Sequence, residues 1–233
     1  MPRTSNDASQ VLVIQPTAEH KATVIFAHGL GQVNATWHMA FTKAFAHQFP
    51  TVQWLLPQAP LRRVSMNQGM LRPSWFNIWQ LPPHPADYDE QAVTESISTI
   101  EDLILSQIHS GIDPKRIFLM GFSQGAALSL MVGLTTLNEL GGVIAMSGWL
   151  PAGYRKHINL APSFPILWCH GTHDGEIPIA YGTDAVNFIK SLSSSDGSHS
   201  SGVAVRTYCG LQHSINDQEL ADIAAFLRAQ LQS

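Results

Sequence analysis

The chain has 233 residues, 45% of them hydrophobic and 13% charged, which is typical of one compact globular domain and excludes a largely disordered chain. Its formal net charge is −4 and it has no run of Lys or Arg, so it lacks the basic surface that nucleic acids or anionic lipids bind. No segment approaches the roughly 18 consecutive apolar residues of a membrane span, and the polar residues 1–10 do not resemble a secretory signal. We therefore expect a cytoplasmic protein with a flexible N-terminus at residues 1–10.

Short runs of β-branched and aromatic residues alternate along the chain with longer segments of helical period. This alternation predicts a single-domain α/β fold, with a mostly parallel sheet and helices on both of its faces. Several of the runs are continuously apolar, as expected for parallel strands that are buried on both faces. The predicted strands begin at Val11, Thr23, Val52, Arg116, Gly142, Pro165 and Val203.

Two segments have the apolar period of a helix that packs on a sheet. From Val93 to Ile108, Val and Ile recur at steps of three and four, which predicts a helix that ends near Gly111. The same spacing from Leu220 to Leu231 predicts a C-terminal helix, with acidic residues in its first turns as the helix dipole favours.

Two stretches fit neither period. Residues 61–89 combine four prolines with Met, Trp and Phe side chains, and a connection this long is usually functional, so we expect a lid or pocket wall. The Ser/Gly-rich stretch that begins at Ser191 is expected to be a mobile surface loop. Cys169 and Cys209 each end a β-rich run and are expected to be buried thiols; a disulfide between them would need an oxidising compartment.

A G-x-S-x-G pattern at Gly121, Ser123 and Gly125 lies directly between a predicted strand and an Ala/Leu-rich helical stretch. A strand before and a helix after are what a nucleophile elbow requires, in which a sharp turn exposes the serine hydroxyl. An ordinary Gly-rich turn is the alternative. The context predicts that Ser123 is a catalytic nucleophile.

A serine hydroxyl needs a neighbouring base, and the base needs a group that fixes its tautomer. His213 and Asp174 each follow a predicted strand, so both should lie at the same sheet edge as Ser123. We expect His213 to be the general base and Asp174 the acid that orients it, with Glu176 as the local alternative for the acid. His170 and His173 could bind a metal together with Asp174, but no further ligand has a matching spacing, so neither a metal nor another cofactor is expected.

The tetrahedral oxyanion of such a reaction must be stabilised by preorganised N–H donors. The turn HGLG begins at His28 after a predicted strand and should leave the backbone N–H of Leu30 unpaired. The second donor should be the N–H of Gln124, at the start of the helix that follows Ser123. His28 is expected to brace this turn rather than to act as a second base.

An apolar channel for an acyl chain is also predicted. We expect its wall to come from the 61–89 segment and from two later loops that follow strands. The alternative is that these side chains only cover an edge of the core. The expected wall residues are Met70, Trp75, Phe76, Trp149 and Ile177.

Six separated motifs occur in an order that resembles the acyl-protein thioesterase, lysophospholipase and carboxylesterase family of α/β hydrolases. They are HGLG from His28, RPSWFNIW from Arg72, GFSQGAALSL from Gly121, SGWLP from Ser147, HGTHDGEIP from His170 and QHSI from Gln212. The resemblance implies the α/β-hydrolase fold. It matches Ser123, Asp174 and His213 to the family's triad, and Leu30 and Gln124 to its oxyanion donors.

The chain departs from the family's usual pattern at Asn77, where SWFD is common, and at Ala126, where many relatives have Gly. It also lacks the N-terminal cysteine that is lipidated in mammalian members, so at most transient contact with a membrane surface is expected.

The resemblance implies a serine hydrolase that cleaves (thio)esters of fatty-acylated substrates through an acyl-enzyme. The substrate is expected to be an acylated protein, a lysophospholipid or a small ester. A carboxylesterase for small esters is one alternative, and a binding protein that has lost catalysis is another. We expect a monomer or weak homodimer.

Overall fold

The computed structural model describes residues 11–85, 87–158, 161–192 and 202–232. The predicted flexible N-terminus and most of the predicted Ser/Gly-rich loop therefore lie outside the described residues. Ser191, at which the loop was predicted to begin, belongs to a helix that extends to Leu192.

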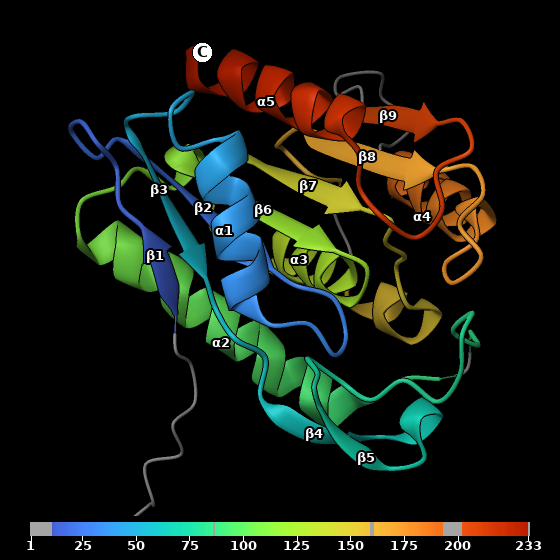
Figure 1. Cartoon of the computed structure of the whole chain (residues 1–233). Coiled ribbons are helices and arrows are strands. Elements are labelled where there is room, and N and C mark those ends of the chain that lie inside the picture. The colour runs from blue at the N-terminus through green and yellow to red at the C-terminus, as the bar shows by residue number, and fades with distance from the viewer. Residues whose placement is uncertain (1–10, 86, 159–160, 193–201, 233) are drawn as a thin grey trace, which may run out of the picture.

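A seven-stranded sheet forms the centre of the molecule, in the order β1-β3-β2-β6-β7-β8-β9 (Figure 1). Only β1 runs antiparallel to its neighbour, which confirms the predicted mostly parallel sheet. Every residue of four adjacent strands in this order, β2, β6, β7 and β8, is buried. The strands are β1 (Leu12–Ile14), β2 (Ala22–Ala27), β3 (Val52–Leu56), β6 (Ile117–Phe122), β7 (Gly142–Met146), β8 (Ile166–Gly171) and β9 (Val203–Tyr208).

Helices cover both faces of this sheet, as predicted. One face carries α2 (Glu90–His109), α3 (Gln124–Thr135) and α4 (Ile179–Leu192). The other carries α1 (Asn34–Ala44) and α5 (Asp217–Gln232); in Figure 1, α1 lies in front of the sheet at the left and α5 runs along the top. Two short 3₁₀ helices, η2 (Pro114–Arg116) and η3 (Ala152–His157), complete the connections. Each face thus buries its own apolar core, and the strands β2, β6, β7 and β8 between the two cores are inaccessible to water.

The 61–89 segment is more regular than the sequence indicated. It begins with an antiparallel hairpin of β4 (Leu61–Val64) and β5 (Met70–Pro73), joined through a 3₁₀ turn, η1 (Ser65–Asn67), and separate from the main sheet (Figure 1). The prediction missed it because each strand has four residues, too few to show a period, and because Pro73 is unusual in a strand.

Both cysteines are free, and only one is buried as predicted. Cys169 lies within β8, where burial raises the pKa of its thiol. Cys209 is exposed, so the prediction was wrong there. It follows β9, which is the edge strand of the sheet and has Val205, Arg206 and Thr207 exposed just before it. Among the described residues, no helix combines the length and apolar character needed to cross a bilayer.

Candidate active site

Ser123 lies on the sharp turn between β6 and α3, with φ 55° and ψ −119°. A non-glycine residue rarely adopts this conformation, and the two flanking glycines make room for it. A Cβ on Gly121 would come within 2.2 Å of the Gly125 carbonyl oxygen, and one on Gly125 within 2.0 Å of the Ala27 carbonyl oxygen. The pattern G-x-S-x-G is therefore required by the close approach of neighbouring backbone.

Three residues that are far apart in sequence meet at this turn. The Nε2 atom of His213 lies 2.9 Å from the Oγ atom of Ser123, and the Nδ1 atom lies 2.7 Å from the Oδ2 atom of Asp174. Asp174 follows β8, and His213 lies between β9 and α5. The ring of His213 packs on Phe122, with their centroids 4.9 Å apart. The structure thus brings together the nucleophile, base and acid that the sequence predicts, at distances that permit a proton relay.

The carboxylate of Asp174 is buried and well supplied with donors. Its Oδ1 atom accepts the backbone N–H groups of Glu176 and Ile177 at 3.0 and 2.8 Å. Burial alone would raise the pKa of Asp174, but the hydrogen bonds from His213 and from Ile177 outweigh it and hold the pKa below its usual value. The side chain therefore remains ionised and accepts the Nδ1–H of His213.

Glu176 occupies a different position from the orienting acid. Its Oε2 atom lies 3.7 Å from the Nε2 atom of His213, which is the nitrogen that faces Ser123, and 58% of its side chain is exposed. A carboxylate there cannot fix the proton on Nδ1. The geometry therefore favours Asp174 over the alternative that the sequence left open.

The other two histidines near the acid have local partners. His170 is buried, which lowers its pKa, and it donates from Nε2 to the carbonyl of Ile177 at 2.7 Å. The Nδ1 atom of His173 lies 3.0 Å from the hydroxyl of Thr172. Across the described ranges, no group of three His, Cys, Asp or Glu side chains is placed to hold a metal ion.

Two backbone N–H groups near Ser123 have no acceptor within the part of the chain that the structure describes. In the turn after β2, Gly31 donates to the carbonyl of Pro73 at 2.8 Å and Gln32 donates to the carbonyl of Gly29 at 3.2 Å, while the N–H of Leu30, directly before Gly31, stays unpaired. Gln124 is the first residue of α3, where the N–H has no acceptor inside the helix. These are the two donors that the sequence predicts.

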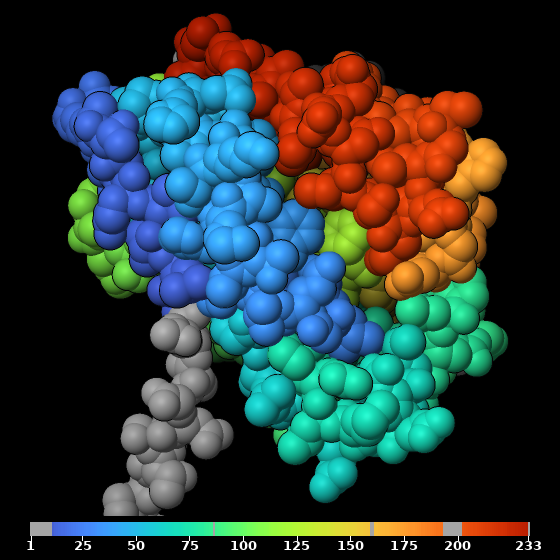
Figure 2. Space-filling view, viewed as in Figure 1, coloured from blue at the N-terminus to red at the C-terminus, as the bar shows by residue number. Residues whose placement is uncertain are grey.

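A cavity of about 470 Å³ opens beside Ser123 and His213. Figure 2 shows a hollow between the blue N-terminal part, the teal hairpin region and the red C-terminal part of the chain. Leu30 and Glu176 line the cavity, together with the polar side chains of Gln32, Asn67 and Arg72. Its apolar wall comes from Met66, Ile78, Leu81 and Phe122.

None of the five residues predicted to form an acyl channel is among the residues that line this cavity. Met70 is 49% exposed on the hairpin, whereas Trp75 and Ile177 are fully buried. Phe76 and Trp149 line a separate, narrow crevice. The predicted segment does contribute to the cavity wall, but through Met66, Ile78 and Leu81, which no periodic pattern in the sequence distinguishes from their neighbours.

Asn77 accounts for the departure from the SWFD pattern. Its Oδ1 atom accepts the backbone N–H of Ser65 at 2.8 Å, and its Nδ2 atom donates to the hydroxyl of Ser65 at 2.8 Å. An amide can make both bonds, and it ties the start of the hairpin turn to the segment that follows Trp75.

Comparisons with known proteins agree with this geometry. The chain matches the phospholipase/carboxylesterase family over residues 8–231. It is 37% identical over 230 residues to "Acyl-protein thioesterase 1" of Cryptococcus neoformans, covering 93% of this chain and 95% of that protein. It is 33% identical over 228 residues to the protein of the same name in Saccharomyces cerevisiae, covering 94% of this chain and 96% of that protein.

Solved structures give the same picture. The crystal structure of Zea mays acyl-protein thioesterase 2 superposes with a TM-score of 0.82 at 26% identity, covering 95% of this chain and 99% of that one. Arabidopsis thaliana SOBER1 superposes with a TM-score of 0.80 at 30% identity, covering 91% and 99%. With its central sheet and its serine on a strained turn, the chain belongs to the phospholipase/carboxylesterase family of α/β hydrolases and is a serine hydrolase that acts on esters.

Proposed function

We propose that this chain is an acyl-protein thioesterase, which removes fatty acyl groups from cysteine residues of proteins. One observation carries the proposal: the relay from Ser123 through His213 to Asp174, at 2.9 and 2.7 Å, opens onto a cavity with an apolar wall. The curated relatives that cover the chain almost end to end bear the same name.

The reaction proceeds through two displacements. The Oγ atom of Ser123 attacks the carbonyl carbon of the thioester while the Nε2 atom of His213 accepts the hydroxyl proton. The C–S bond then breaks, and His213 returns the proton to the leaving thiolate. Asp174 stabilises the imidazolium between these steps. The acyl group remains on Ser123 as an ester.

Water that enters the cavity completes the catalytic cycle by hydrolysing the acyl-enzyme. His213 accepts a proton from the water as it attacks the acyl-enzyme, and returns that proton to the Oγ atom of Ser123 when the acid leaves. In both halves the carbonyl oxygen becomes negatively charged. The unpaired N–H groups of Leu30 and Gln124 are the donors that stabilise this charge.

The acyl chain lies against the apolar wall formed by Met66, Ile78 and Leu81. Each methylene that leaves water contributes about 0.8 kcal/mol, so longer chains gain affinity only as far as the wall extends. Lysophospholipids present the same acyl carbonyl and are a second substrate class for this site. At most transient contact with a membrane surface, a cytoplasmic location and a monomeric or weakly dimeric state stay predictions of the sequence.

A carboxylesterase for small esters is the second candidate, and one observation favours it. The cavity is polar along Gln32, Asn67 and Arg72, and the residues expected to form a long channel do not line it. A short acyl group needs no such channel.

Turnover of acyl esters of increasing length, measured beside a palmitoylated peptide, separates the two candidates. A thioesterase for fatty acyl groups gives kcat/KM values that rise from acetyl to octanoyl esters, and it releases palmitate from the peptide. A small-ester carboxylesterase gives values that fall with length and leaves the peptide intact. Labelling of Ser123 by a fluorophosphonate probe excludes a protein without catalysis, and absence of labelling would count against both candidates.

A further inference from the structure

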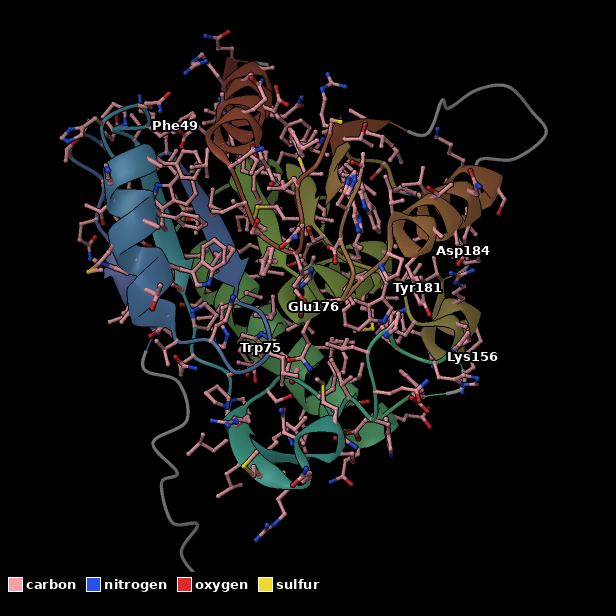
Figure 3. All side chains as sticks on the ribbon, turned by 45° about the vertical axis from the view of Figure 1, so that its right-hand side comes forward. Phe49, Trp75, Lys156, Glu176, Tyr181 and Asp184 are labelled. Atoms are coloured by element: carbon pink, nitrogen blue, oxygen red, sulfur yellow. The ribbon has the colours of Figure 1, made fainter. Side chains whose placement is uncertain are left out.

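Trp75 is fully buried and makes three hydrogen bonds, although it does not touch the cavity beside Ser123. Its backbone N–H donates to the Oε1 atom of Gln124 at 2.9 Å, and its indole Nε1–H donates to the carbonyl of His28 at 2.8 Å. The hydroxyl of Ser96, on α2, donates to its carbonyl. Figure 3 shows Trp75 in the interior, between the two-stranded hairpin and the main sheet.

The first bond fixes one of the two N–H donors. Gln124 provides its backbone N–H to the oxyanion, while its side chain points away into the 74–76 segment. There the Oε1 atom accepts from Trp75, and the Nε2 atom donates to the carbonyl of Phe76 at 2.7 Å and to the hydroxyl of Ser74 at 3.2 Å. Gln124 is fully buried, so no water competes for these bonds. The first residue of α3 is thereby anchored by its side chain.

The second bond fixes the turn that carries the other donor. The carbonyl of His28 accepts from the indole, and the ring of His28 spans the same turn. Its Nε2 atom accepts the backbone N–H of Ala59 at 3.0 Å, so the proton sits on Nδ1, which donates to the carbonyl of Gly29 at 2.8 Å. Burial lowers the pKa of His28 and keeps the ring neutral, as this pattern requires. Leu30 comes two residues after the carbonyl that Trp75 holds.

We propose that Trp75 is a positioning residue, which holds the N–H groups of Leu30 and Gln124 where both can donate to the oxyanion of the tetrahedral intermediate. It joins two turns whose N–H donors, Leu30 and Gln124, are 94 residues apart in sequence. This inference rests on the proposed function, because it concerns the same reaction at the same serine. It replaces the predicted role of Trp75 as part of a channel wall.

The chain offers a matched pair of substitutions. Trp75→Phe removes the indole N–H and its bond to His28, and leaves a small void. Trp54→Phe leaves a void of the same size, but the indole nitrogen of Trp54 is buried without any hydrogen-bond partner in the described structure. Both tryptophans are fully buried, so the pair separates the lost hydrogen bond from the lost volume.

Active sites are first counted by complete labelling with a fluorophosphonate, so that kcat refers to folded enzyme. Removing an oxyanion donor outright costs about 10² to 10³ in kcat. Trp75→Phe keeps the backbone N–H that bonds to Gln124 and releases only the turn that carries Leu30, so it should cost less, about 10- to 50-fold. We expect this loss in Trp75→Phe, with KM for an octanoyl ester unchanged within about threefold because the ground state makes little use of these donors. Trp54→Phe should stay within about twofold of the wild type.

The inhibition constant Ki of a trifluoromethyl ketone distinguishes a positioning role of Trp75 from a merely structural one. The ketone's adduct with Ser123 places a negative oxygen where the intermediate does, so its Ki should rise in Trp75→Phe by the same factor by which kcat/KM falls. Gln124→Met is a second variant, which keeps the backbone N–H and a similar volume while removing the amide. It releases the other donor, so it should show a loss of similar size, and it decides the question if Trp75→Phe yields no titratable enzyme.

Equal kcat per site and equal ketone Ki in Trp75→Phe and Trp54→Phe would overturn the inference, as would a Gln124→Met enzyme with wild-type values. Ser123→Ala distinguishes this failure from failure of the proposed function. If Ser123→Ala is inactive while Trp75→Phe behaves as its control, only the positioning role is wrong. If Ser123→Ala is active, the proposed function itself is wrong.

Discussion

Replacing Asp174 by Asn should invert the tautomer of His213. The Oδ1 atom of Asp174 accepts two backbone N–H groups, from Glu176 and Ile177, while Oδ2 accepts from the Nδ1 atom of His213. The two backbone donors will hold the amide oxygen of an Asn on their side, so its NH₂ group will face the ring. Because that group donates, His213 must accept at Nδ1 and carry its proton on Nε2, toward Ser123.

An imidazole with its proton on Nε2 cannot accept the proton of Ser123. In a Ser-His-Asp relay this wrong tautomer costs about 10⁴ in kcat, which corresponds to roughly 5.5 kcal/mol of transition-state stabilisation at about 1.4 kcal/mol per tenfold. Both donors to Oδ1 survive in the variant, so the loop from residue 174 to 177 should stay folded. The loss should therefore fall on kcat rather than on the amount of folded enzyme.

Hydrolysis of a chromogenic octanoyl ester, with active sites counted by fluorophosphonate labelling, measures the effect. Glu176→Gln is the control, because this half-exposed carboxylate lies near Nε2 and not near Nδ1 of His213. It should stay within about tenfold of the wild type, as expected for an exposed charge pair. If Glu176→Gln loses about 10³-fold while Asp174→Asn stays within tenfold, the assignment of the acid is refuted.

Three further predictions concern the cavity, a buried acid and the elbow. Met66→Asp should lower kcat/KM for octanoyl esters at least about tenfold more than for acetyl esters. Met70→Asp, on the exposed side of the hairpin, is the control and should change neither value. The reverse result would support the channel wall that was predicted from the sequence. Burial raises the pKa of Glu219 to about 8, and both carboxylate oxygens lack partners among the described residues. An acid whose pKa is raised in the folded state costs no stability at a pH below its pKa in the unfolded state, which is 4.5 here. Between pH 4.5 and pH 8 it lowers the free energy of unfolding by up to about 1.4 kcal/mol per pH unit. In thermal melts, the free energy of unfolding of Glu219→Gln should therefore rise relative to that of the wild type by several kcal/mol between pH 5 and pH 8. A difference in unfolding free energy that stays constant with pH would contradict the raised pKa of Glu219. Gly125→Ala should abolish activity and lower the melting temperature, because its Cβ would meet the Ala27 carbonyl oxygen at 2.0 Å; full activity would mean that the elbow is looser than described.

The parts of the fold that follow from local pattern were predictable from the sequence. All seven strands of the main sheet occur where short β-rich runs place them, and the strands buried on both faces, such as β6 and β7, have the continuous apolar runs that this burial needs. Ser123, Asp174 and His213 each follow a strand, and the carboxyl ends of parallel strands meet at one sheet edge. Their convergence could therefore be expected without knowledge of the tertiary structure.

The parts that depend on distant contacts were not predictable. Trp75 and Met66 belong to one segment of similar composition, yet Trp75 is buried and Met66 faces the cavity. The difference arises because the backbone of Trp75 bonds to Gln124, 49 residues later, and its indole to His28, 47 residues earlier. No local period records such bonds. The exposure of Cys209 likewise depends on β9 being the edge of the sheet, which composition does not reveal.

Release of palmitate from a palmitoylated peptide by the wild type and by Ser123→Ala tests the central claim most directly. Nucleophile and base act as one unit, so the account predicts that Ser123→Ala loses about 10⁴ to 10⁶ in kcat while its melting temperature stays close to that of the wild type. A Ser123→Ala protein that keeps a tenth of the wild-type rate would contradict the assignment of Ser123, and a wild type that leaves the peptide uncleaved would contradict the proposed thioesterase activity.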